Sequence, residues 1–210
     1  MSVALPVTSD ITLADLVAKA TGTCVLHCYQ CGRCAAGCPQ NVDGSMDISP
    51  TRIMRLLQLE DTFSDDPAVA AGYARQALTS ATCWLCAGCQ ACTTRCPQGV
   101  DIAGIMDVLR QQALALGLEA TDQRSRDIQK FHATFLAAAL KNGRIHELDL
   151  VLRYKAASGH WLQDASVGWE MWRRGKLSLG RSGKVDTGKI QTAMEHIASA
   201  ADGPMGDVKK

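Results

Sequence analysis

The sequence has few aromatic residues, almost no net charge and no long apolar run. Aromatic residues make up 5% of its 210 residues, and the formal net charge is +1. A nearly neutral chain gives no indication of a nucleic-acid partner or of an anionic membrane surface. The longest apolar run covers residues 135–140, far short of the about 20 residues that a membrane span needs. We therefore expect neither a nucleic-acid partner nor a membrane span.

Several sequence signatures are also missing. The N-terminus has no basic segment, and Asp10 and Asp15 interrupt its apolar residues. We therefore expect no signal peptide and a cytoplasmic location. There is no Gly-x-Gly-x-x-Gly fingerprint for a flavin or nicotinamide cofactor and no His-Glu-x-x-His zinc motif. No Ser/His/Asp grouping or paired carboxylates stand out either. We expect no catalytic residue in this chain.

The sequence is rich in cysteine instead. Ten cysteines are present, and eight of them form two runs of the pattern C-x2-C-x2-C-x3-C-P. The first motif is residues 28–39 and the second is residues 86–97. This spacing is typical of bacterial [4Fe-4S] ligand runs, in which the fourth cysteine binds the other cluster of a two-cluster protein. The sequence therefore predicts two [4Fe-4S] clusters as cofactors.

The same rule predicts how the cysteines divide between the clusters. The first cluster is expected to be held by Cys28, Cys31, Cys34 and Cys96. The second is expected to be held by Cys86, Cys89, Cys92 and Cys38. Small residues and glycines between the cysteines would let backbone N–H groups approach the cluster sulfurs and tune their reduction potential.

Other interpretations of the cysteines are possible. Disulfides are disfavoured because no export signal is present. A zinc site usually takes two C-x2-C pairs, whereas each run here offers more cysteines than a tetrahedral zinc ion uses. Cys24 and Cys83 lie outside the pattern, and we expect each to be a small buried residue near a cluster. A second motif whose ligands begin at Cys83 instead of Cys86 is conceivable. His27 could tune the potential of a cluster, although we expect it to have a packing role.

Helix-start signals recur along the chain. Each is a polar residue that can cap a helix, followed by proline or by apolar residues at helical spacing. The predicted helices cover residues 13–20, 50–59, 67–78, 102–117, 122–141, 144–157 and a last stretch after Asp186. Residues 40–47 are expected to form a polar loop and residues 177–184 to be irregular. The repeat of motif, Cys-Pro and capped helix suggests an internal duplication.

These elements predict a mainly α protein, an α-helical two-cluster ferredoxin-like domain with a C-terminal helical extension. The expected parts are an N-terminal segment (1–22), the two-cluster domain (23–118) and the extension (119–210). The extension holds Trp161, Trp169 and Trp172 beside a basic group at residues 173–176. It either packs on the protein's own helices or docks a partner subunit, since Trp and Arg are enriched at interface centres.

Beyond the cysteines, the sequence resembles the C subunit of heterodisulfide reductases, including the equivalent component of bacterial sulfur-oxidising complexes of this type. The resemblance covers roughly residues 25–180. The segments that carry it are His27–Cys34, Met46-Asp47 with Ser49-Pro50, Trp84–Cys86, Gly99–Ile102 with Arg110, Phe131–Tyr154 and Gly175–Leu179. Cys24 and Cys83 depart from the pattern, and the last thirty residues match weakly.

The resemblance implies a non-catalytic electron-transfer subunit of a hetero-oligomeric oxidoreductase. Such a subunit relays electrons between a flavin-containing A-type subunit and a B-type subunit with cysteine-rich CCG motifs. Because no adjacent Cys-Cys pair occurs here, the B-type module would be another chain. The high alanine and arginine usage leans toward the bacterial, sulfur-oxidising branch.

Two further hypotheses fit the doubled motif. One is the iron–sulfur subunit of a glycolate, glycerol-3-phosphate or succinate-type dehydrogenase, although the CCG or plant-type [2Fe-2S] domains that usually accompany those motifs are absent from this sequence. The other, of a different class, is a zinc-stabilised helical interaction module without a redox role.

Overall fold

The chain is helical throughout the part that the structure describes. The computed structural model describes residues 12–143, 145–161, 165–176, 187–189, 192–193 and 196. No strand occurs in these ranges, so the prediction of a mainly α fold is confirmed. The chain divides into two compact units, residues 1–126 and 127–210. Each unit is described by itself below.

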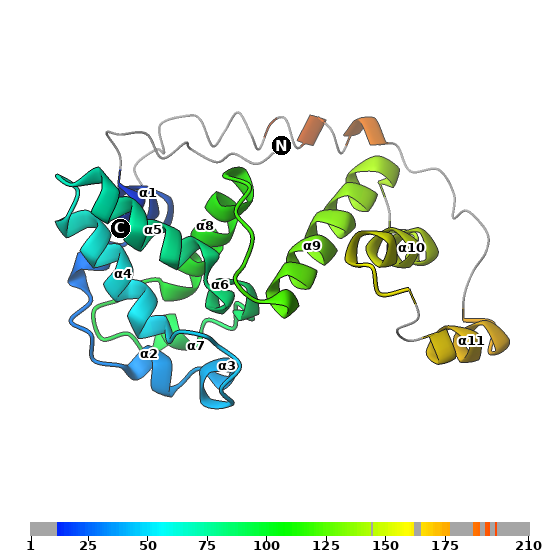
Figure 1. Ribbon diagram of the computed structural model, residues 1–210, viewed down its shortest axis with the longest axis horizontal. Coiled ribbons are helices and arrows are strands. Elements are labelled where there is room, and N and C mark those ends of the chain that lie inside the picture. Colours follow the sequence, from blue (N-terminus) through cyan, green and yellow to red (C-terminus); the bar gives the residue numbers. More distant parts are fainter. Residues whose placement is uncertain are drawn as a thin grey trace. The chain divides into compact units, whose positions relative to one another are not determined.

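Four helices form the core of the first unit (Figure 1). They are α1 (Leu13–Thr21), α4 (Pro50–Thr62), α5 (Pro67–Thr79) and α8 (Ile102–Ala115). Helix α4 packs against α1 and α5, and α8 packs against the same two helices. Leu13, Leu57 and Leu109 are 0% exposed at the centre of this arrangement. Because each helix turns one apolar stripe inward, the helices close over a shared core.

The predicted caps of these helices are present. Thr12 and Asp15 form a capping box at the start of α1, in which the Asp15 N–H donates to Thr12 Oγ1 at 3.0 Å. Ser49, Asp66 and Asp101 each accept hydrogen bonds from the first turn of α4, α5 and α8 respectively. These side chains satisfy backbone donors that have no partner within the helix.

A buried carboxylate joins α1 to α4. Glu60 of α4 accepts hydrogen bonds from the backbone N–H groups of Leu13 at 2.8 Å and Ala14 at 3.2 Å. Burial raises the pKa of Glu60, and these two hydrogen bonds act in the opposite direction. A carboxylate is favourable here because the N-terminus of a helix carries positive partial charge.

Short helical segments flank the two cysteine motifs. They are the 3₁₀ segment η1 (Val25–His27) and the helices α2 (Arg33–Ala36), α3 (Pro39–Val42), α6 (Ala81–Leu85) and α7 (Ala91–Thr94). Helix α3 lies where the loop of residues 40–47 is expected to begin, so that prediction is wrong for the first part of the loop. Pro39 at the first helical position favours this turn because its fixed φ is already helical.

Asp47 connects the two motifs through helix α6. Its Oδ1 accepts hydrogen bonds from the hydroxyls of Ser80 and Thr82, each at 2.8 Å, and from the Thr82 N–H at 3.0 Å. Its Oδ2 accepts the N–H of Ala81 at 3.1 Å. The Thr82 hydroxyl oxygen in turn accepts the N–H of Ile48 at 3.3 Å. The chain that leaves the first motif is thereby fixed to the helix that leads into the second.

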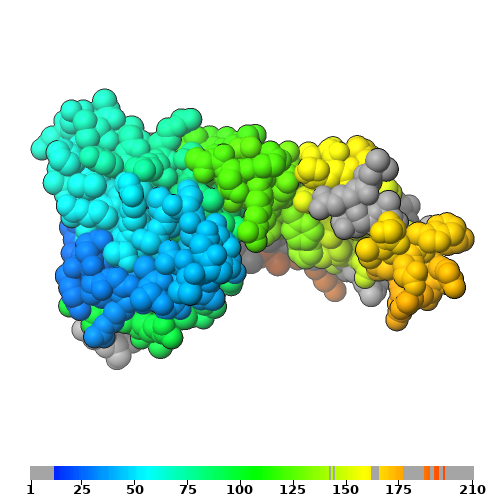
Figure 2. Space-filling view, turned by 60° about the horizontal axis from the view of Figure 1, so that its bottom comes forward, coloured from blue at the N-terminus to red at the C-terminus, as the bar shows by residue number. Residues whose placement is uncertain are grey.

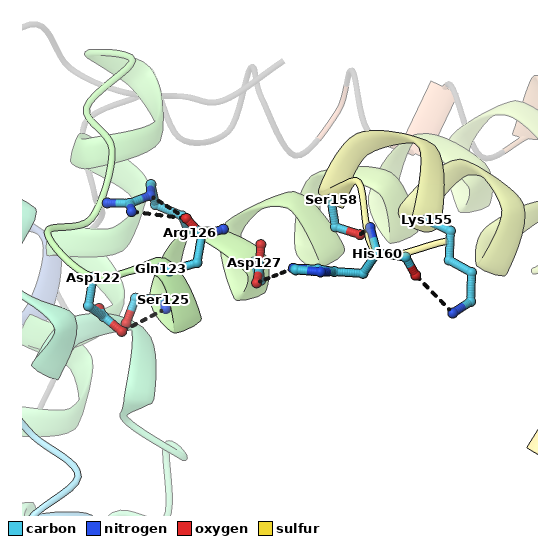
Figure 3. Close-up of polar contacts among 8 residues, drawn as sticks. All are labelled: Asp122, Gln123, Ser125, Arg126, Asp127, Lys155, Ser158 and His160. Atoms are coloured by element: carbon cyan, nitrogen blue, oxygen red, sulfur yellow. Dashed lines mark hydrogen bonds and ion pairs between the residues drawn. The ribbon is translucent and has the colours of Figure 1, made fainter. Parts of the chain in front are cut away.

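In the second unit, residues of α9 (Gln123–Asn142) pack with α10 (Glu147–Ser158). The rings of Phe131 and Tyr154 meet edge to face, with centroids 5.6 Å apart. The loop after α10 is held by His160, whose Nε2 lies 3.3 Å from Asp127 Oδ2 (Figure 3). The Lys155 ammonium also donates to the His160 carbonyl at 3.2 Å. Aromatic and polar contacts together fix this pair of helices.

Helix boundaries in the second unit differ in part from the predictions. Helix α9 ends before Gly143 as predicted, whereas α10 begins at Glu147, three residues later than expected. Helix α11 (Ala165–Arg173) was not expected as a helix. The segment predicted to be irregular, 177–184, lies outside the described residues. Of the last predicted helix, residues 187–189, 192–193 and 196 are described and are helical.

Within the described part of the chain, no helix has both the length and the apolar character needed to cross a membrane.

The Asp47 contacts predict a measurable loss of stability when the carboxylate is replaced. Hydrogen bonds from Thr82 and Ser80 outweigh burial and lower the pKa of Asp47, which keeps it ionised at neutral pH. We expect Asp47→Asn to reduce the free energy of unfolding by about 1–2 kcal/mol, because an amide cannot accept at both positions. Thermal unfolding followed by circular dichroism at pH 7 measures this loss.

The matched control is Asp43→Asn. Asp43 lies in the same loop, and its Oδ1 accepts the N–H of Ser45 at 2.9 Å without reaching α6. We expect the midpoint temperature of thermal unfolding to fall less for Asp43→Asn than for Asp47→Asn. Equal losses would show that the connection to α6 is not the important contact.

Candidate functional site

The two motifs adopt the same unusual backbone conformation. In each, the residue before the second cysteine and the residue after it have positive φ angles. These residues are Gln30 (φ 62°) and Gly32 (φ 78°) in the first motif, and Gly88 (φ 64°) and Gln90 (φ 61°) in the second. A glutamine at positive φ is strained, and such strain is concentrated at functional sites. The repeated conformation supports the duplication expected from the sequence.

The motifs lie side by side through their short helices. Helices α2 and α7 each begin five residues after the first cysteine of their motif, and they pack against each other (Figure 1). The Arg95 side chain of the second motif covers Gly37 of the first so closely that a Cβ there would collide with its guanidinium. In Figure 2 the blue surface of the first motif borders the green surface of the second.

This packing places Cys38 of the first motif beside the second motif. One pocket is lined by Cys38 together with Cys86, Cys89 and Cys92. Apart from Gln40, the rest of its lining is small or apolar: Pro39, Met46, Pro50, Ala87, Ala91, Ile102, Ala103 and Met106. The structure thus brings together the four cysteines predicted to hold the second cluster.

Cys96 of the second motif lies beside the first. Burial raises the pKa of the Cys28 thiol, and repulsion from Cys34, Cys96 and Cys31 adds to this rise. The same Cys96 also contributes to the raised pKa of Tyr29, next to Cys28. Cys96 is therefore an electrostatic neighbour of Cys28, the first of the three cysteines with which it is predicted to bind the first cluster.

Burial disfavours the ionised form of thiols in both sets. Burial raises the pKa of Cys86 and of Cys92, as it does for Cys28. The backbone N–H groups of Gln30 and Gly88 oppose this rise at Cys28 and Cys86. Without a cation, thiols with raised pKa stay protonated at neutral pH, so metal binding is coupled to loss of their protons.

The first cysteine of each motif is held by one long polar side chain. Gln58 of α4 donates to the carbonyls of Cys28 at 2.6 Å and Val25 at 3.2 Å. Arg110 of α8 donates to the carbonyl of Cys86 at 3.2 Å. The helix that follows each motif therefore supports that motif's loop. Sequence reasoning missed Gln58, although a glutamine on the apolar face of a predicted helix is a usable signal.

Other groups contact the cysteine sulfurs directly. The Thr51 hydroxyl lies 3.2 Å from Cys34 Sγ, and the Val100 N–H donates to Cys96 Sγ at 3.4 Å. The thioether sulfur of Met46 lies 4.0 Å from Cys38 Sγ. The role of Thr51 was also missed from the sequence, because no spacing rule links a helix-start threonine to a cysteine seventeen residues earlier.

The two cysteines outside the pattern differ from each other. Cys83 is 0% exposed and donates to the carbonyl of Ala77 at 3.5 Å, and burial raises its pKa to about 12. This agrees with the packing role expected for it. Cys24 is only partly buried, so the expectation of a buried residue is not met there. The side chain of His27 is exposed.

The residues present fit a pair of iron–sulfur clusters better than a pair of single ions. Each set offers four cysteines. The residues with positive φ angles open each loop, so that backbone N–H groups reach the cysteine sulfurs. Across the described ranges, no three His, Cys, Asp or Glu side chains gather closely enough to hold one metal ion. The assignment of individual cysteines to each cluster stays a prediction.

Known proteins are similar to this chain in sequence. Residues 27–100 match the family model described as a 4Fe-4S dicluster domain. The chain is 35% identical over 101 residues to the iron-sulfur C subunit of the CoB--CoM heterodisulfide reductase of Methanopyrus kandleri, covering 48% of this chain and 45% of the relative. It is 27% identical over 116 residues to the C subunit of the H(2):CoB-CoM heterodisulfide,ferredoxin reductase of Methanothermobacter thermautotrophicus, covering 53% and 52%.

A relative from another complex also matches. The chain is 29% identical over 135 residues to the iron-sulfur subunit of the 8-methylmenaquinol:fumarate reductase of Wolinella succinogenes, covering 62% of this chain and 39% of that subunit. The chain spans about half the length of the heterodisulfide reductase subunits that it matches. The chain is therefore similar to heterodisulfide reductase C subunits over about half of its length, and two [4Fe-4S] clusters are the cofactors of its 4Fe-4S dicluster domain.

Proposed function

We propose that this chain is the electron-relay subunit of a cytoplasmic heterodisulfide reductase-like complex. In this proposal it passes electrons between a flavin-containing A-type subunit and a CCG-containing B-type subunit. The complex would act on sulfur compounds in the oxidative direction. The pairing of Cys38 with the second motif and of Cys96 with the first supports a relay, because two interlocked sets of ligands keep two redox centres close together.

The chain's own residues have a holding and insulating role. When bound, [4Fe-4S] clusters supply one-electron oxidation and reduction. Cys31 and Cys89 are exposed, whereas Cys34 is buried, so each motif turns its second cysteine toward the surface. An exposed ligand at each motif gives two points at which electrons could enter and leave. The largely apolar lining around Cys38 limits the access of water to the partly buried ligands Cys86 and Cys92.

Helix α11 is the surface that we propose for docking a partner subunit. Trp169 and Trp172 are 64% and 52% exposed, and their rings lie tilted at 32° to each other with centroids 5.1 Å apart. Arg173 and Lys176 at the end of this helix are exposed as well. Figure 2 shows the residues of α11 in orange at the surface of their unit. An apolar patch with acidic neighbours on an A-type or B-type subunit would complement it.

A second candidate is the iron–sulfur subunit of a fumarate reductase or succinate-type dehydrogenase complex. The match to the 8-methylmenaquinol:fumarate reductase subunit supports it, and it covers more of this chain than the heterodisulfide reductase matches cited above. The proteins that co-purify with the chain separate the two candidates. A- and B-type subunits would support the first, and a dicarboxylate-reducing flavoprotein would support the second.

Metal analysis tests the cofactor assignment. We expect about eight iron atoms per chain, together with electron paramagnetic resonance (EPR) signals that appear on reduction, because each [4Fe-4S] cluster contains four irons. The measurement is elemental analysis of the anaerobically purified chain. Stoichiometric zinc without iron would overturn the assignment and favour the interaction-module hypothesis.

The crossed arrangement of ligands predicts a specific effect of Cys38→Ser. We expect this substitution to perturb the cluster held by Cys86, Cys89 and Cys92, because Cys38 lines the same pocket as those three residues. EPR spectra of the reduced protein, before and after substitution, measure which signal changes. A change confined to the other cluster would contradict crossed ligation.

Cys83→Ala is the matched control for that experiment. Its thiol is buried close to the second motif but bonds to the Ala77 carbonyl. We expect both cluster signals to persist in Cys83→Ala. Loss of the second cluster would instead support the shifted register that begins at Cys83.

The docking surface predicts that assembly and cluster binding can be separated. We expect the double variant Trp169→Ala/Trp172→Ala to bind its partner subunits at least about tenfold more weakly, because truncation of buried interface tryptophans typically costs about 2 kcal/mol or more. Quantitative co-purification measures the binding, and EPR measures the clusters. Leu116→Ala, an exposed apolar residue of the first unit, is the control. Unchanged assembly, or loss of the clusters, would argue against docking through α11.

A further inference from the structure

The third cysteine of each motif has a different polar neighbour. Cys34 Sγ lies 3.2 Å from the hydroxyl of Thr51, the second residue of α4. The second residue of α8, which follows the other motif, is Ala103, and it has no hydroxyl. The two motifs thus share a backbone conformation but not this contact.

A threonine near Cys92 does not replace the missing hydroxyl. Thr93 lies beside Cys92 in sequence. Burial raises the pKa of the Cys92 thiol, and hydrogen bonds from Thr93 act in the opposite direction. A hydroxyl has one proton, and that of Thr93 is donated to Asp101 Oδ1 at 3.0 Å. The Thr93 oxygen in turn accepts the N–H of Ala103 at 3.1 Å. Thr93 is engaged in fixing the start of α8.

The direction of the Thr51 contact follows from the state of the sulfur. A cysteine that binds a metal centre does so as the thiolate, which has no proton to donate. The Thr51 hydroxyl must then be the donor and Cys34 Sγ the acceptor. Because Cys34 is only 6% exposed, water has little access to replace this hydrogen bond. A hydrogen bond in such a poorly solvated position has a stronger electrostatic effect than one in water.

We propose that Thr51 is a positioning residue that raises the reduction potential of the cluster held by Cys28, Cys31 and Cys34. Reduction adds negative charge to a cluster and its sulfur ligands. A donor to one of those sulfurs stabilises the reduced state more than the oxidised state, so the potential rises. This inference rests on the proposed function in that it requires two redox-active [4Fe-4S] clusters.

The test is a redox titration of the full-length chain followed by EPR, with dithionite as reductant and ferricyanide as oxidant. We expect Thr51→Val to shift the midpoint potential of the first cluster to a more negative value, because valine keeps the shape of threonine without its hydroxyl. Thr51→Ser keeps a hydroxyl and is expected to retain most of the original potential. The second cluster serves as an internal reference whose potential stays unchanged in both variants.

Thr62→Val is a matched control on the same helix. The Thr62 hydroxyl donates to the carbonyl of Gln58 at 2.7 Å, so the substitution removes one threonine hydroxyl from α4 without touching a cysteine sulfur. We expect both midpoint potentials to stay at their original values. Thr51→Ala, measured alongside, provides a second variant without the hydroxyl in case valine prevents cluster binding.

The outcomes separate this inference from the function on which it rests. Absence of two reducible [4Fe-4S] signals in the unsubstituted chain would overturn the proposed function. Two normal signals with an unshifted first potential in Thr51→Val and Thr51→Ala would overturn the role of Thr51 alone. A shift in Thr51→Ser as large as in Thr51→Val would also overturn it, because the hydroxyl would not be the cause.

Discussion

The carboxylate of Asp47 is the contact on which the relation between the two motifs depends. It accepts hydrogen bonds from Ser80, Ala81 and Thr82 at the start of α6, the helix that leads into the second motif. A loop that has just left the first motif is thereby fixed, and its neighbour Met46 lies against Cys38. If this contact were absent, the loop after the first motif would lose four hydrogen bonds to the start of α6.

The electrostatics of the site favour the loaded protein. Burial makes it costly to ionise several of the thiols, and glutamines at positive φ add local strain to both loops. Neither cost is offset by the contacts between the thiols, which repel one another once ionised. A bound cationic cluster removes the first cost, since it takes up the negative charge of the thiolates. The fold of the first unit and the binding of its cofactors are therefore energetically coupled.

Much of this site could be predicted from the sequence, because cysteine spacing and helix caps are local signals. The eight motif cysteines, the capping box of Thr12 and Asp15, and the cap at Ser49 all depend on residues a few positions apart. The supporting contacts could not be predicted in this way. Gln58 reaches Cys28 and Arg110 reaches Cys86 across tertiary distances that no spacing encodes. Helix α11 was missed because its tryptophans were considered for their composition, although Trp169 and Trp172 stand at the i, i+3 spacing of a helix.

The position of Cys38 among the cysteines of the second motif has a consequence for biosynthesis. A ribosome makes the first motif well before the second. If Cys96 completes the first set and Cys38 the second, as the motif rule predicts, neither set is complete until translation has passed Cys96. Cofactor insertion would then follow synthesis of both motifs and the meeting of their loops. Maturation of this domain would be a late event rather than a stepwise one.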